Sequence, residues 1–84
     1  MTYEELQKAK DIERELKSIT EHISDIVYLM DRGVFSGSVG IEAKGTSCYR
    51  RISAKPETIM AFLRTVKNEH INRRSELEEE LKNL

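Results

Sequence analysis

The sequence predicts an α+β, mostly α protein: a long antiparallel helical hairpin with a β-hairpin between its two helices. Apolar residues recur at steps of three and four in the first and last thirds of the chain, as on one face of a helix. Between them, glycines and serines gather and hydrophobicity alternates with period two, as in strands. We expect a single domain, 1–84, with helices at about 3–32 and 56–82 and the β-hairpin at about 38–52.

The first helix is expected to begin at a capping box formed by Thr2 and Glu5. The Thr2 hydroxyl can accept a hydrogen bond from the Glu5 backbone N–H, and the Glu5 side chain can reach back. The apolar positions that follow form a coiled-coil seam, held for about three heptads: Ala9, Ile12, Leu16, Ile19, Ile23, Ile26 and Met30. Gly33 suits the left-handed residue that follows a last helical turn.

The β-hairpin is expected to turn at Lys44-Gly45. Such a turn pairs Ala43 with Thr46, Ile41 with Cys48, Gly40 with Tyr49 and Ser38 with Arg51. By alternation, one face then carries the apolar set Val39, Ile41, Cys48 and Ile52, and the other carries Ser38, Gly40, Glu42, Ser47, Tyr49 and Arg51. An isolated hairpin is marginal in water, so the apolar face should rest on another surface.

The second helix should begin at Pro56, whose fixed φ suits a first turn, after Ser53 or Lys55 as the cap. Its seam continues the same spacing: Ile59, Leu63, Val66, His70, Arg73 and Leu77. An antiparallel arrangement then places Ile12 near Leu77 and Met30 near Ile59. Two helices leave each seam half covered, so we expect a homo-oligomer, either a dimer with a four-helix arrangement or a larger ring.

The composition narrows the classes of function. The chain is 38% apolar and 35% charged with no tryptophan, which predicts a thin core that needs a disulfide, a metal or a partner chain. The single cysteine, Cys48, excludes an internal disulfide, and two histidines with one cysteine show no metal-site spacing, so we expect no cofactor. The remaining support is a second copy of the chain.

Charge and hydropathy predict a cytoplasmic protein that contacts no membrane. Net charge is −1, which argues against nucleic acid, and no apolar run approaches the roughly 20 residues that span a bilayer. The acidic, polar start at residues 1–5 is the opposite of a signal peptide.

No pattern indicates catalysis, and we expect no enzyme. Cys48 is expected to pack as a small thiol on the apolar strand face rather than to act as a nucleophile. The acidic run at 76–80 reads as a solvated helix face, and no glycine-rich loop matches a phosphate-binding pattern.

His70 and Arg73 interrupt the second seam. They could fix the register of the oligomer, as single buried polar residues do in coiled coils, or line a pocket between subunits. His70 could equally be a partly exposed ring that packs on its neighbours.

The candidate ligand-binding residues lie on and around the β-hairpin. Arginine offers a planar fork for phosphate or carboxylate, and tyrosine offers a stacking surface. With nearby hydroxyls they suit a nucleotide-like anion: Tyr49, Arg50, Arg51, Ser38, Ser47 and Arg32. The alternative is that Tyr49 only stabilises strand pairing by lying over a glycine.

The layout also resembles that of very small proteins of bacteriophages and other mobile elements. A charged first helix, a glycine-containing β-hairpin and the Ile52–Ile59 junction into a Glu/Lys-rich helix carry the resemblance, which covers most of the chain. Some members of that class resemble sponges, which oligomerise and sequester a cyclic-nucleotide or cyclic ADP-ribose signal of host immunity. The resemblance implies such a role for the chain but assigns no individual residue to it.

The leading hypothesis is therefore a non-catalytic homo-oligomer that sequesters a small nucleotide-like anion at subunit interfaces. The main alternative is an inhibitor or adaptor that binds a host protein through its helical seam or hairpin edge, and depends on Phe35, Phe62 or Tyr28. A third hypothesis, nucleic-acid binding through 73–74 and 50–51, is disfavoured by the balanced charge.

Overall fold

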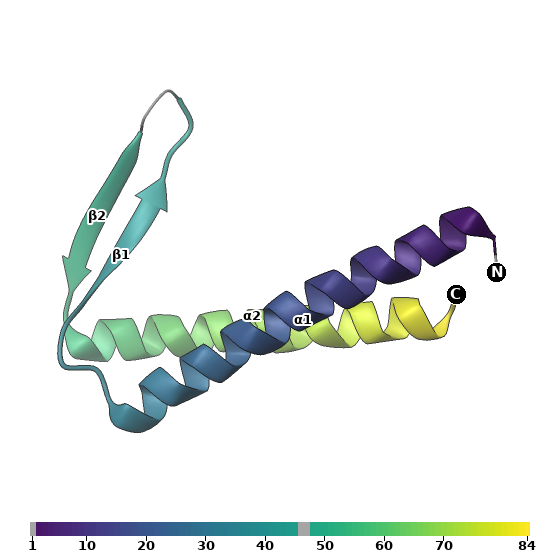
Figure 1. Ribbon diagram of the computed structural model, residues 1–84. Helices are drawn as coiled ribbons and strands as arrows, with labels where there is room; N and C mark the ends of the chain where they lie inside the picture. The colour runs from purple at the N-terminus through teal and green to yellow at the C-terminus, as the bar shows by residue number, and fades with distance from the viewer. Residues whose placement is uncertain (1, 46–47) are drawn as a thin grey trace.

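The computed structural model describes residues 2–45 and 48–84. Its elements follow in the order α1 (Tyr3–Arg32), β1 (Gly37–Glu42), β2 (Tyr49–Ala54) and α2 (Pro56–Lys82). The two helices pack against each other, and the strands form an antiparallel hairpin that rises from the end where α1 stops and α2 starts (Figure 1). The predicted fold class is confirmed. We call β1, β2 and their connecting loop the arm.

The ends of both helices have identifiable local causes. The Glu5 backbone N–H donates a hydrogen bond of 3.1 Å to the Thr2 hydroxyl, as the capping box predicts. At the other end of α1, Gly33 has φ 82° and its N–H donates to the Leu29 carbonyl. Lys55 is the N-cap of α2 and caps with no side-chain hydrogen bond, so Pro56 is the remaining local signal that starts this helix.

The hydrophobic core lies between the two helices. Its buried members on α1 are seam residues: Ala9, Ile12, Ile19 and Ile26. On α2, Ile59 and Leu77 are buried, and Leu77 is the most enclosed side chain at 1% exposure. Ile12 and Leu77 belong to one cluster, so the predicted helix register is confirmed there. The α1 seam is only partly covered by α2, because Leu16, Ile23 and Met30 are not fully buried. This fits the expectation that two helices leave each seam half covered.

The register of the β-hairpin differs from the prediction by two residues. Gly40 pairs with Arg51 and Glu42 with Tyr49, and the Ala43 N–H donates to the Cys48 carbonyl at 2.7 Å. A two-residue shift leaves every side chain on its predicted face, so the hydrophobic pattern cannot detect it. The residues of the expected turn argue against the predicted register. A tight two-residue hairpin turn favours positive φ at both central positions, which suits Gly45 but not Lys44.

The molecule is flat and open. It spans 50 × 36 × 14 Å, and its radius of gyration is 16.6 Å, against about 12 Å for a compact domain of this length. In Figure 1 the start of α1 and the end of α2 lie at the same end of the molecule, far from the arm. The arm contacts the helices mainly where the base of β1 meets the start of α2, where an added Cβ on Gly37 would lie 3.1 Å from Ile59. Both faces of the arm are therefore largely uncovered.

Candidate functional site

The polar face of the arm brings together three of the predicted ligand-binding residues. In the observed register, alternation places Ser38, Tyr49 and Arg51 on the same face, together with Gly40, Glu42 and Ser53. Tyr49 and Arg51 are both exposed. Their nearness follows from the strand itself, because residues two apart on one strand project in the same direction. We call this set the polar arm face.

The Tyr49 ring lies diagonally across Gly40. A Cβ added to Gly40 would collide with the hydroxyl end of this ring, so glycine is what allows the close approach. Tyr49 thereby stabilises the strand pair, as the alternative interpretation of this residue predicted. The contact also holds the ring against the backbone, with about half of its surface open to solvent. A fixed aromatic surface of this kind can stack on a planar ligand.

Arg51 is available to bind an anion. Among residues 2–45 and 48–84, its side chain makes no hydrogen bond or ion pair. Glu42 lies on the same face, two register positions nearer the tip and directly paired with Tyr49, so an anion would be favoured at the Arg51 end of the face and disfavoured at the tip.

The other predicted ligand-binding residues do not join this group. Arg50 projects from the opposite face, and its guanidinium donates a 2.8 Å hydrogen bond to the Tyr49 carbonyl. Arg32 lies at the end of α1, where its guanidinium stands 5.6 Å from the Tyr28 ring centroid in a cation–π contact. Ser47 lies outside the described residues, as does Thr46, the expected pairing partner of Ala43.

The opposite face of the arm is apolar and exposed. Val39 pairs with Ile52 there, Ile41 lies beside them, and Cys48 follows towards the tip. We call these four residues the apolar arm face. The expectation that Cys48 packs as a buried thiol is wrong, because Cys48 is exposed.

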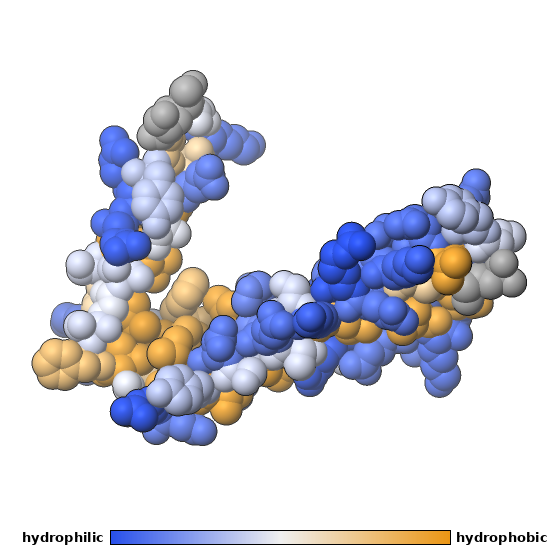
Figure 2. Space-filling model, viewed as in Figure 1, coloured by the Kyte–Doolittle hydropathy of each residue, from blue (hydrophilic) through white to orange (hydrophobic). Residues whose placement is uncertain are grey.

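A groove of about 300 Å³ lies at the elbow between the arm and the helices. Its walls include Leu29 of α1, Val39 of β1, and Ile59 and Phe62 of α2. Figure 2 shows hydrophobic residues gathered at this junction. We call it the elbow groove. The groove was not expected from the sequence, although Phe62 lies outside the seam spacing of α2 and so is free to line another surface.

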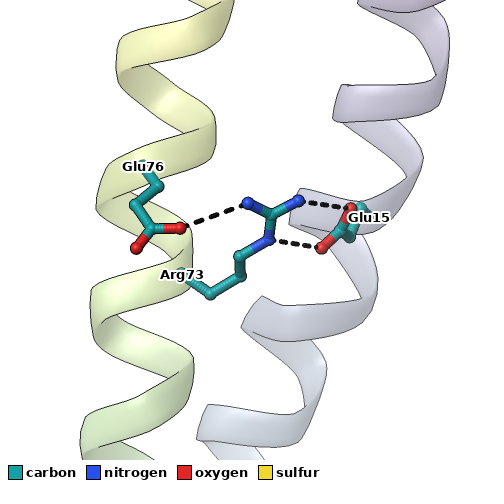
Figure 3. A network of polar contacts seen from close by, with 3 residues as sticks. All are labelled: Glu15, Arg73 and Glu76. Atoms are coloured by element: carbon teal, nitrogen blue, oxygen red, sulfur yellow. Dashed lines mark hydrogen bonds and ion pairs between the residues drawn. The ribbon is translucent and has the colours of Figure 1, made fainter.

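Arg73 links the two helices rather than binding a ligand. Its guanidinium contacts Glu15 of α1 through Nε at 2.9 Å and Glu76 of α2 through Nη1 at 3.2 Å (Figure 3). The hydrogen bond with Glu15, followed by that with Glu76, raises the pKa of Arg73 above its ordinary value. Arg74 lies 3.9 Å from Glu78. Both arginines therefore already have acidic neighbours.

His70 packs against a neighbouring ring. Its ring centroid lies 5.4 Å from that of His22 of α1, and the planes are tilted by 34°. His70 is half-buried, which fits the interpretation of a ring packed on its neighbours. The His22 contact was not anticipated, although the antiparallel register already places the two histidines at similar heights.

The described part of the chain contains no group of three or more His, Cys, Asp or Glu residues placed to hold a metal ion. Among the described helices, none is both long enough and apolar enough to cross a membrane. No protein-family model, curated protein or solved structure gave a significant match to this chain.

Proposed function

We propose that this protein is a non-catalytic, homo-oligomeric binding protein that holds a small, nucleotide-like anion on the polar arm face. The observation that carries the proposal is the pairing of an uncommitted guanidinium, Arg51, with an exposed ring, Tyr49, on one face of the same strand. Arg51 would contact the phosphate, Tyr49 would stack on the base, and Ser38 would supply a hydroxyl.

The contrast with Arg73 supports this choice of residue. Both Arg51 and Arg73 are exposed, but Arg73 is held by two carboxylates, whereas Arg51 has no such partner among the described residues. A ligand phosphate therefore displaces no ion pair when it binds Arg51. The acidic neighbours of Arg73 and Arg74 also weaken the hypothesis of nucleic-acid binding at that surface.

The resemblance in layout to small phage proteins suggests sequestration as the biological role. A sponge holds its ligand without altering it, so binding needs only complementarity and no reactive group. We therefore propose an anti-defence role in which the protein, in the cytoplasm, lowers the free concentration of a nucleotide signal.

The test is native mass spectrometry of the purified protein with a panel of linear and cyclic nucleotides. We expect an oligomer that gains a discrete small-molecule mass. Arg51→Ala should weaken binding at least about 10-fold, the usual effect of losing a charge-assisted hydrogen bond, without changing the oligomer. Arg51→Lys should recover only part of the affinity, because lysine keeps the charge and loses the fork.

Arg14→Ala is the matched control, because Arg14 is a largely exposed arginine of α1 whose sole ion pair within the described residues is with Asp11, at 3.6 Å. It removes the same charge far from the arm and should leave binding unchanged. Equal loss in both variants would indicate a general charge effect, and unchanged affinity in Arg51→Ala would overturn the assignment of Arg51.

A second candidate function is recognition of another protein. Phe35, between α1 and β1, is 96% exposed, and Tyr28 and Phe62 are also exposed. Large aromatic side chains are frequent anchors of protein interfaces. Under this hypothesis Phe35→Ala abolishes the capture of one specific partner from a host lysate, and Arg51→Ala does not.

A further inference from the structure

The apolar arm face and the elbow groove form one continuous surface. Val39 belongs to both, because it lines the groove and shares its strand face with Ile41 and Ile52. Ile52 is 55% exposed, and Ile41 is nearly as open. Phe62 extends the same surface onto α2. Large aliphatic and aromatic side chains exposed together in this way are typical of an interaction site.

The surface that this chain exposes in excess of a compact monomer is similar in area to what each subunit of a stable dimer buries. The chain exposes 6835 Å², whereas a compact monomer of 9.7 kDa exposes about 5,100 Å². The excess is about 1,700 Å², and each subunit of an obligate homodimer buries roughly 1,000–2,500 Å². A second copy of the chain is therefore sufficient to cover the surface.

We propose that the apolar arm face and the elbow groove form a self-complementary interface between two copies of this chain. The arm of each copy packs on the apolar surface of the other around a two-fold axis. This inference deepens the proposed homo-oligomer and rests on it. It also moves the interface from the place that the sequence suggested. On α1, four of the seven seam residues are buried, whereas Ile41 and Ile52 of the arm stay about half exposed.

The distribution of charge on the arm is compatible with a second copy of the chain packing on the apolar arm face. Alternation places Arg50 on the same side as the apolar arm face, and no other charged side chain of β1 or β2 lies there. Its guanidinium reaches the Tyr49 carbonyl, so its stem can lie along an apolar surface while the charge stays at the rim. Two such faces meet with little electrostatic conflict, and the net charge of −1 adds only weak repulsion.

The interface also gives the polar arm face a place in the assembly. With the apolar face covered, the arm becomes the middle of a layered structure. Tyr49 and Arg51 remain open on its outer side, whereas Ser38 lines the elbow groove and lies at the edge of the interface. A marginal two-stranded hairpin thus becomes a supported one. Oligomerisation then precedes ligand binding, because it fixes the strand that carries Tyr49 and Arg51.

The test is sedimentation equilibrium over about 1–100 µM, a range that detects ordinary dimers. The key variant is Ile52→Glu, which places a carboxylate in the proposed interface. We expect self-association at least about 100-fold weaker than wild type, because a two-fold interface receives every substitution twice. The matched control is Ser53→Glu, which adds the same charge one residue along the same strand but on the opposite face. It should associate like wild type.

A second variant keeps the test independent of hairpin folding. Phe62→Glu changes an exposed side chain of α2 in the elbow groove and should weaken association while the helical circular dichroism remains. A monomeric wild type at about 100 µM would overturn the interface, as would wild-type association of both Ile52→Glu and Phe62→Glu. Equal disruption by Ser53→Glu would do the same. If the wild-type protein dimerises through this surface but binds no nucleotide, the proposed ligand is wrong and the proposed interface is supported.

Discussion

The helical pair and the arm each carry an apolar face. In the helical pair much of that face is buried, whereas in the arm most of it is exposed to water. In the helical pair, Ile12 and Ile19 face Leu77 across a shared core, and each is nearly removed from water. In the arm, Ile41 and Ile52 are as apolar as those residues, yet about half of each side chain is exposed. The two regions differ in what lies opposite the apolar face, and the residues themselves are alike.

The arginine side chains of the two regions also differ in their contacts. Arg73 lies between two helices and contacts carboxylates from both of them. Arg51 lies on the largely exposed strand β2, and no acidic side chain among the described residues reaches its guanidinium. Arg73 is therefore engaged within the fold, whereas Arg51 has no ionic partner among the described residues.

Secondary structure explains why the arm is the uncovered region. A helix satisfies its backbone hydrogen bonds internally and needs cover along one stripe, which a second helix supplies. A two-stranded hairpin has two faces and two edges, and a stable sheet needs a further layer or strand. Both proposals therefore concern the arm. One concerns its polar face and the other its apolar face.

The largest expected effect of a single substitution is at Leu77, the most enclosed side chain of the core. Leu77→Ala removes buried methyl groups and leaves a cavity between α1 and α2, which costs about 2–5 kcal/mol in the free energy of unfolding. Chemical denaturation followed by circular dichroism measures the loss. A loss below about 1 kcal/mol would mean that the core is not the main source of stability.

Leu6→Ala is the matched control, because it makes the same chemical change at a site of α1 that is 44% exposed. Little apolar surface is lost from the core there, so we expect a change of less than about 1 kcal/mol. Similar losses in Leu6→Ala and Leu77→Ala would contradict the contrast between a packed and an uncovered site.

The helical pair was largely predictable from local signals. Thr2 with Glu5, Gly33 and Pro56 mark helix ends, and the seam identifies the buried face. The hairpin faces were also predictable, because alternation survives a shift of two residues. The register was not predictable from the pattern, since a shift of two residues leaves the alternation of apolar and polar residues unchanged.

The candidate site was predicted less well, for reasons that particular residues make clear. Arg50 and Arg51 are neighbours in sequence, but adjacent residues of a strand point to opposite faces. The two side chains of one chain therefore cannot both bind the same small ligand. The sequence pattern leaves the role of Arg73 open between fixing the register of the oligomer and lining a pocket between subunits, and its contact with Glu15 of α1 was not anticipated. The antiparallel register contained that signal, because it places residue 73 near residue 16.

A smaller effect is expected within the arm at Gly40. Gly40→Ala forces the Tyr49 ring away from the strand, which should weaken the hairpin by about 1 kcal/mol and leave the helices unchanged. Amide hydrogen exchange resolves the two regions, with faster exchange expected in β1 and β2 alone. The substitution should have little further effect in a Tyr49→Ala background. An undiminished effect there would show that the ring contact is not its cause.

The smallest effect is expected for the ion pair between Glu15 and Arg73, because both side chains are nearly half exposed to water. A double-mutant cycle with Glu15→Ala and Arg73→Ala should give a weak favourable coupling that decreases as salt is added. The raised pKa of Arg73 means that its contribution is fully present below the ordinary arginine pKa and is lost only as the pH rises through the raised one. Deprotonation of Arg73 should therefore not change the coupling at neutral or mildly alkaline pH. A strong, salt-independent coupling would show instead that this contact is shielded from solvent, as it would be if a second copy also covered the helical pair.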